Sequence, residues 1–103
     1  MANICYNQFY ISFDKENYDE VVKRISNLFN KELNGEITGI DSEYIEGYFD
    51  SRWVFPMHIF ENIFDGLENI YMRCLSEEYG CDYVAMNIYT DNKWKYEQTF
   101  DLY

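Results

Sequence analysis

The sequence predicts an α+β fold in which two helices lie on one face of a mainly antiparallel sheet. Two hydrophobic patterns support this prediction: several segments alternate between apolar and polar residues, as strands do, and two segments repeat apolar residues at helical spacing. Turn-forming residues separate these segments. With 103 residues, the chain is expected to form a single domain that spans residues 1–103.

The first strand is expected over residues 4–13, where the side chains alternate between two faces. A helix is expected over residues 16–33, with Asp14 as a side-chain cap at its start. Asn34-Gly35 is expected to end this helix, because glycine adopts the left-handed conformation without a side-chain penalty. The apolar residues at helical spacing are Tyr18, Val21, Val22, Ile25, Leu28, Phe29 and Leu33.

Residues 36–53 are rich in β-branched and aromatic residues, and they are expected to form one long strand or two short ones. Turns are expected at Gly39 and at Asp41-Ser42. A second helix is expected to begin at Pro56, whose missing N–H group costs nothing in the first turn of a helix. Its apolar face would contain Ile59, Phe60, Ile63, Phe64 and Leu67, and Gly66 would mark its end.

Three further strands are expected in the last third of the chain. Alternation over residues 69–78 is followed by a turn at Tyr79-Gly80, and the pattern repeats over residues 82–90. Asp91-Asn92-Lys93 has the composition of a hairpin turn, and residues 94–102 alternate again. If this last strand forms an exposed edge, it would allow pairing with a second copy and therefore a homodimer.

The chain is strongly acidic, with 19 Asp and Glu residues against eight Lys and Arg residues and a formal net charge of −11. Such a charge repels nucleic acid and favours basic protein surfaces. Aromatic residues make up 20% of the chain, so we expect a buried core despite the charge. The sequence shows neither a signal peptide nor an apolar run near the ~20 residues that span a bilayer, and the protein is expected in the cytoplasm.

No set of residues predicts a catalytic, metal or cofactor site, and the protein is expected not to be an enzyme. Cys5, Cys74 and Cys81 form no CxxC pair. An odd number of cysteines does not predict a disulfide framework, and with His58 as the only histidine no zinc site is expected. Nothing in the spacing pairs a thiol with a base. The glycines form no phosphate-binding loop and the carboxylates no calcium loop. RNA binding on the tyrosines is opposed by the shortage of basic residues.

Three short segments carry a family resemblance. They are Met1-Ala2-Asn3-Ile4-Cys5-Tyr6-Asn7, Ser51-Arg52-Trp53-Val54-Phe55-Pro56 and Glu77-Glu78-Tyr79-Gly80-Cys81-Asp82-Tyr83. Together they resemble the YubB-type ferredoxin-like domain of phage and plasmid proteins, which usually has Trp where Ile4 stands here. The resemblance covers most of the chain and implies a ferredoxin-like fold and an origin on a mobile element. The matched residues look architectural, and no catalytic residue is carried over.

Two regions of the chain are rich in acidic residues and poor in basic ones. Residues 36–51 contain five acidic residues without a Lys or Arg, and residues 61–82 contain six that are opposed only by Arg73. If the fold places both sets on one side, their carboxylates would approximate a row of phosphates, and tyrosines would add apolar anchors. The residues predicted to bind a partner are Glu36, Asp41, Glu43, Tyr44, Glu46, Tyr48, Asp50, Glu77, Glu78 and Asp82.

These features favour a phage or mobile-element inhibitor that binds a basic nucleic-acid-binding protein of the host's defence as a nucleic-acid mimic. A CRISPR-Cas complex is the first expected target, which would make the protein an anti-CRISPR, and a restriction enzyme is the second. One alternative is a steric or allosteric binder, monomeric or dimeric, that acts away from the nucleic-acid groove through exposed Tyr48, Phe49 or Phe55. Further alternatives are an enzyme of unrecognised type and an acidic surface that only keeps the protein in solution.

Overall fold

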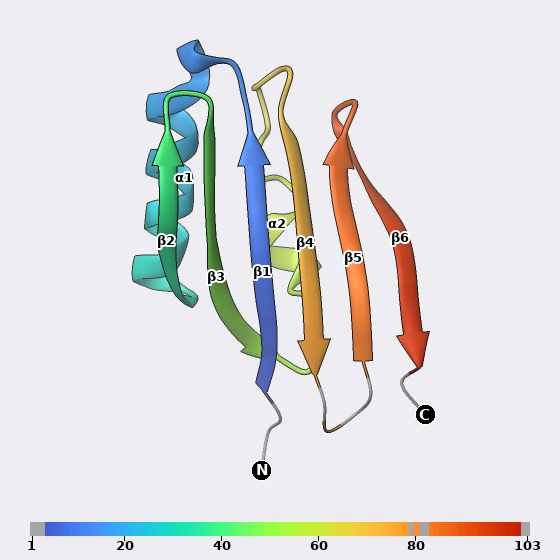
Figure 1. Cartoon of the computed structure of the whole chain (residues 1–103). Coiled ribbons are helices and arrows are strands. Elements are labelled where there is room, and N and C mark those ends of the chain that lie inside the picture. The colour runs from blue at the N-terminus through green and yellow to red at the C-terminus, as the bar shows by residue number, and fades with distance from the viewer. Residues whose placement is uncertain (1–3, 79, 81–82, 102–103) are drawn as a thin grey trace.

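A six-stranded antiparallel sheet with two helices on one face forms the protein (Figure 1), which confirms the predicted α+β class. The computed structural model describes residues 4–78, 80 and 83–101. The strand order is β2-β3-β1-β4-β5-β6, and every neighbouring pair is antiparallel. The elements are β1 (Ile4–Ser12), η1 (Lys15–Asn17), α1 (Tyr18–Lys31), β2 (Asn34–Asp41), β3 (Tyr44–Arg52), α2 (Met57–Phe60), β4 (Tyr71–Glu78), β5 (Tyr83–Thr90) and β6 (Lys93–Asp101).

Helix α1 forms where the apolar periodicity predicts it, and it buries Val21 and Ile25 against the sheet. Its start differs from the prediction, because the chain enters through the short 3-10 turn η1 and Asp14 makes no side-chain cap. The Asp14 carboxylate accepts a hydrogen bond from Asn69 Nδ2 instead, at 3.0 Å. This contact ties the start of the helical layer to the segment that leads into β4.

The predicted left-handed end of α1 at Asn34-Gly35 is wrong. The helix ends at Lys31, the backbone N–H groups of Glu32 and Leu33 donate to the Leu28 carbonyl, and β2 begins at Asn34. Gly35 is needed for a close approach, since a Cβ atom there would lie 2.7 Å from Phe49 Cβ.

Residues 34–52 form two strands, β2 and β3, joined by a turn at residues 42–43. The turn predicted at Asp41-Ser42 is therefore confirmed to within a residue. The turn predicted at Gly39 is wrong, because Gly39 lies inside β2 beside a break in register between Ile37 and Gly39.

Helix α2 is much shorter than the apolar spacing predicts. It covers Met57–Phe60, and residues 61–67 continue as short turns up to Gly66, which has a φ of +82°. Arg24, held by Glu20 at 2.7 Å, donates to the carbonyl oxygens of Ile63 and Asp65 at 2.9 and 2.8 Å. These long-range hydrogen bonds fix the segment that follows α2 against α1.

An aromatic core fills the space between the sheet and the helices. The rings of Phe49 and Phe60 stack with centroids 5.3 Å apart, Phe55 stacks on Phe60 at the same distance, and Trp94 Nε1 donates to the Phe60 carbonyl at 3.2 Å. Phe64, the other buried residue of the predicted second helix face, packs on Tyr89. The core therefore joins β3, the α2 segment and the β5-β6 hairpin in one cluster.

The β5-β6 hairpin turns where the sequence predicts. Asp91 and Asn92 have φ values of 54° and 62°, and these two consecutive left-handed residues match the twist of a tight hairpin. The turn predicted at Tyr79-Gly80 falls partly outside the described residues. In the part of the chain that the structure describes, no helix is long and apolar enough to cross a membrane.

Gly47→Ala is expected to lower the free energy of unfolding by about 1–3 kcal/mol, because overpacking would push β2 away from β3. A Cβ atom at Gly47 would lie 2.1 Å from the Glu36 carbonyl oxygen and 3.0 Å from Ile37 Cα. Urea unfolding measures the change. Gly39→Ala is the matched control, since its new methyl group would meet only the movable Glu46 side chain, and an equal loss in both variants would contradict this account.

Candidate partner-binding face and groove

The strands divide their side chains between a face that meets the helices and a face that has no helix over it, which we call the open face (Figure 1). Along β1, Phe9 and Ile11 are buried under the helices, whereas Tyr6 and Gln8 are exposed on the open face. Cross-strand pairing extends this division to the neighbouring strands. Acidic and tyrosine side chains of β1, β2, β3 and β4 therefore lie beside one another.

Seven of the ten residues predicted to bind a partner lie on the open face. Asp50 and Glu77 lie opposite Tyr6 from its two sides. The seven residues are Glu36, Asp41, Tyr44, Glu46, Tyr48, Asp50 and Glu77. Glu43 lies in the β2-β3 turn, at one end of this face, and is exposed. Asp82 lies outside the described residues.

Glu78 does not belong to the predicted surface. It follows Glu77 in β4 and therefore points to the helix side, where it is 3% exposed. Its Oε1 atom accepts a hydrogen bond from the backbone N–H of Gly80 at 2.8 Å. The expectation that Glu78 contacts a partner is corrected here: its carboxylate holds the turn after β4.

The two acidic regions of the sequence are not brought together as a whole. Glu77 joins the acidic residues of β2 and β3 on the open face. Glu61, Asp65 and Glu68 are exposed on the segment between α2 and β4, in the helical layer. The row of carboxylates is therefore built mainly from the β2-β3 hairpin.

Tyr48 and Glu36 form the best-defined polar contact of the open face. The Tyr48 hydroxyl donates to Glu36 Oε2 at 2.6 Å across the β2-β3 pair. This hydrogen bond, together with the negative charges of Glu36 and Asp50, raises the pKa of Tyr48. Tyr48 is still 46% exposed, so its ring is available to a partner.

Arg73 lies near the centre of the open face and was not predicted as a site residue. Its guanidinium carbon lies 4.5 Å from the centroid of the Tyr10 ring, and Tyr10 stacks on Tyr44 at 5.7 Å. Alternation along β1 is enough to predict that Tyr10 lies on this face. Arg73 lies beside Tyr10 because β1 pairs with β4, and this pairing joins residues far apart in the chain. On the β5-β6 side, exposed Lys93 and Lys95 lie away from the acidic hairpin.

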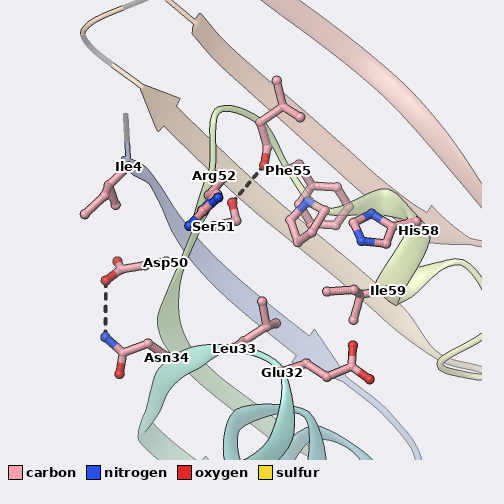
Figure 2. A pocket seen from close by; sticks show the side chains of 12 residues that line it. Ile4, Glu32, Leu33, Asn34, Asp50, Ser51, Arg52, Phe55, His58 and Ile59 are labelled. Atoms are coloured by element: carbon pink, nitrogen blue, oxygen red, sulfur yellow. Dashed lines mark hydrogen bonds between the residues drawn. The ribbon is translucent and has the colours of Figure 1, made fainter. Parts of the chain in front are cut away.

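A groove of about 520 Å³ lies between the end of α1, the end of β3 and the start of α2 (Figure 2). Its lining is mostly apolar, and charged side chains stand around its rim. The apolar lining residues are Ile4, Leu33, Val54, Phe55, Pro56 and Ile59. The rim contains Glu32, Asn34, Asp50, Arg52 and His58. Pattern analysis of the sequence did not predict this groove, because its walls come from three separate segments.

The chain leaves β3 through a strained turn centred on Trp53. Trp53 has a φ of 69°, and the backbone N–H of Val54 donates to the Arg52 carbonyl at 2.7 Å. This combination is the classic form of γ-turn, which is rare and strained for a residue with a large side chain. The turn leaves the Trp53 and Val54 side chains 44% and 47% exposed.

A buried polar network holds this turn in place. Asn7 Nδ2 donates to Ser51 Oγ at 3.0 Å and to the Phe49 carbonyl at 3.1 Å, and Ser51 Oγ donates to the Val54 carbonyl at 2.8 Å. From the other side, Ser76 Oγ donates to Asn7 Oδ1 at 2.6 Å. The network therefore connects β4, through β1, to the end of β3.

The described cysteines are poor candidates for nucleophiles. Burial raises the pKa of Cys74 to about 12, and burial is also the largest cause that raises the pKa of Cys5. His58, the base on which a thiol mechanism would have to rely, is exposed at the rim of the groove. Among the described residues, no group of three or more His, Cys, Asp or Glu side chains is placed to hold a metal ion.

Comparison of this chain with protein-family models, with curated proteins and with solved structures gives no match.

Glu36→Ala is expected to lower the pKa of Tyr48, because it removes the hydrogen bond and the negative charge that favour the protonated hydroxyl. Since folding raises this pKa, the contact stabilises the fold below the ordinary tyrosine pKa and is lost as the pH rises through the raised value. An NMR titration of the tyrosine ring carbons measures the change. Glu43→Ala is the control, and an unchanged Tyr48 titration in Glu36→Ala would contradict the assignment.

Asn7→Ala is expected to lower the free energy of unfolding by about 2–3 kcal/mol, because it leaves buried Ser76 and half-buried Ser51 without their shared partner. Gln8→Ala, on the open face of the same strand, is expected to change it by less than about 0.5 kcal/mol. Combining Asn7→Ala with Ser76→Ala should cost less than the sum of the two single changes. Urea unfolding of the four variants measures this, and additive losses would refute the network.

Proposed function

We propose that this protein is a small acidic inhibitor that binds a basic surface of a host nucleic-acid-handling defence protein through its open face. A CRISPR-Cas complex is the first proposed target, which would make the protein an anti-CRISPR, and a restriction enzyme is the second. Both classes hold nucleic acid with Lys and Arg side chains, which the carboxylates of this face would engage instead. The proposed action takes place in the cytoplasm of the host and needs no cofactor.

One observation carries this proposal: carboxylates and partly exposed tyrosines are arranged side by side on a rigid sheet. Glu36 and Tyr48 lie opposite each other, as do Glu46 and Tyr10. Carboxylates supply charge complementarity, which raises the rate of encounter with a basic partner. Tyrosines supply contact area at a low entropic cost, as they do at many protein interfaces. A surface that only kept the protein in solution would not need this pairing of charge with aromatic rings.

The order of the first elements supports a ferredoxin-like core, and the origin on a mobile element is proposed from the family resemblance alone. The first four strands and the two helices follow the order β1-α1-β2-β3-α2-β4, and the strands lie in the order β2-β3-β1-β4. We propose that this part is a ferredoxin-like core to which the β5-β6 hairpin adds two strands. The three segments that resemble the YubB-type domain lie at the start of β1, at the end of β3 and at the turn after β4.

A second candidate is a steric or allosteric binder that attaches away from the nucleic-acid groove of its target. The exposed apolar side chains of Trp53 and Val54 favour it. Phe49 and Phe55, expected in this role from the sequence, are 0% and 5% exposed and serve the core instead. A dimeric form of this candidate would use β6, which lies at one edge of the sheet.

Reversing two charges of the open face and one in the turn at its end, with Glu36→Lys, Glu46→Lys and Glu43→Lys together, is expected to weaken target binding at least about tenfold at low salt. The matched control reverses three exposed charges of the helical layer, with Asp19→Lys, Glu61→Lys and Glu68→Lys, and so changes the net charge equally. Binding is measured by pull-down from host lysate and then by titration against the purified target, with salt from low to physiological ionic strength.

The two sets of variants separate specific contacts from a general effect of net charge. The nucleic-acid mimic requires that target and nucleic acid compete, and that the open-face variant fails while the control still binds. If both variants bind as the unaltered protein does, or if target, inhibitor and nucleic acid form a ternary complex, the mimic is wrong. A ternary complex would support the steric or allosteric candidate.

A further inference from the structure

Exposed apolar side chains gather at one end of the sheet, where Ile4 and Val54 also line the groove. Ile4, Tyr6, Trp53 and Val54 are 49%, 54%, 44% and 47% exposed. Ile4 and Tyr6 begin β1, directly across from the end of β3, and Trp53 and Val54 follow that end in the chain. Large apolar residues that cluster on a surface mark sites of interaction more often than single ones do.

The structure holds this cluster in place despite backbone strain. A left-handed conformation at a residue with a large side chain costs of order 1–3 kcal/mol and persists only where its surroundings enforce it. Here the Ser51 hydroxyl donates a hydrogen bond to the Val54 carbonyl, and Ser51 Oγ accepts one from the buried Asn7 side chain. These hydrogen bonds thus hold the backbone that carries the exposed Trp53 ring. An exposed aromatic ring on a fixed backbone is typical of an interface anchor.

The groove beside this turn combines an apolar floor with acidic groups on its rim. Leu33 and Ile59 lie across the groove from the end of β3 (Figure 2). Glu32 stands on one side of the rim, and Asp50, which accepts a hydrogen bond from Asn34 at 3.4 Å, stands on another (Figure 2). An apolar floor suits a hydrocarbon side chain, and carboxylates at the rim suit a cation beside it.

Charge decides which kind of occupant this groove favours. With a net charge of −11, the chain repels a second copy of itself and any acidic peptide at moderate salt. Arg52 and His58 are also on the rim, but Arg52 lies on the side opposite Glu32 (Figure 2). Asp50 and Arg52 lie two residues apart on the same face of β3, so a basic segment avoids Arg52 when it approaches along Glu32.

We infer that this groove binds a segment of the protein partner in which a large aliphatic side chain is followed or preceded by Arg or Lys. The aliphatic side chain occupies the apolar floor, and the cation pairs with Asp50 or Glu32. This inference rests on the proposed function, because it assumes a basic protein partner. It adds a second contact, which shares Asp50 with the open face but does not use Glu36, Glu43 or Glu46.

The test uses a short peptide probe on the intact protein. Acetyl-Leu-Arg-Leu-amide is titrated at low salt while the amide and indole signals are followed by NMR. Shifts are expected at Trp53, Val54 and Ile59, and the neutral isostere acetyl-Leu-citrulline-Leu-amide is expected to bind at least about fivefold more weakly. The paired change Asp50→Asn and Glu32→Gln should reduce Arg-peptide binding by a similar factor, whereas Glu61→Gln with Glu68→Gln should not.

Several results would overturn the inference. Equal binding of the Arg and citrulline peptides, binding of acetyl-Leu-Glu-Leu-amide at this place, or shifts confined to the open face would each exclude a cation-selective groove. Concentration-dependent shifts of Trp53 without peptide would show that a second copy occupies the groove. The triple variant Glu36→Lys, Glu43→Lys and Glu46→Lys should keep peptide binding in the groove. If the peptide does not bind in the groove but the charge reversals on the open face still weaken target binding, this inference is wrong and the proposed function stands.

Discussion

The two-sided pairing of β1 is the constraint on which the rest of this structure depends. Because β1 pairs with β3 on one side and β4 on the other, its alternation divides the whole molecule into a core face and an open face. A slip of one residue would exchange Phe9 and Ile11 for Tyr6 and Tyr10 and would destroy both faces. Asn7 opposes such a slip, since it is 1% exposed and its amide finds partners on β3 and β4 only in the observed register.

The same buried contacts support the surface. Asn7 and Ser51 hold the strained turn at Trp53, so the geometry of an exposed aromatic ring depends on hydrogen bonds inside the sheet. The carboxylates of β2 and β3 are likewise set by strand pairing and not by loops. Surfaces built on regular strands lose little entropy when a partner binds, which favours recognition by charge and shape without rearrangement.

Much of the architecture could be predicted from local patterns, and the errors have specific causes. Alternation identified β1 and β4, and the Asp91-Asn92 turn followed from residue types that accept left-handed backbone. The length of α2 was wrong because residues 61–67 form separate turns with hydrogen bonds between residues three apart, and their apolar spacing resembles that of a helix. The role of Glu78 was wrong because a charged residue at the end of a strand was assumed to face the solvent, although its position in the alternation places it inside.

The sequence by itself determined the acidity of the chain, the class of fold and the two faces of each strand, because these depend on composition and on the local period of the backbone. Only the tertiary structure decided which strands are neighbours. Strand order brought Glu77 and Arg73 to the face of Glu36 and Glu46, left Glu61 in the helical layer, and formed the groove from three distant segments. The physical reason is that pairing and packing between residues far apart in the chain depend on all the surfaces buried together, which no local period specifies.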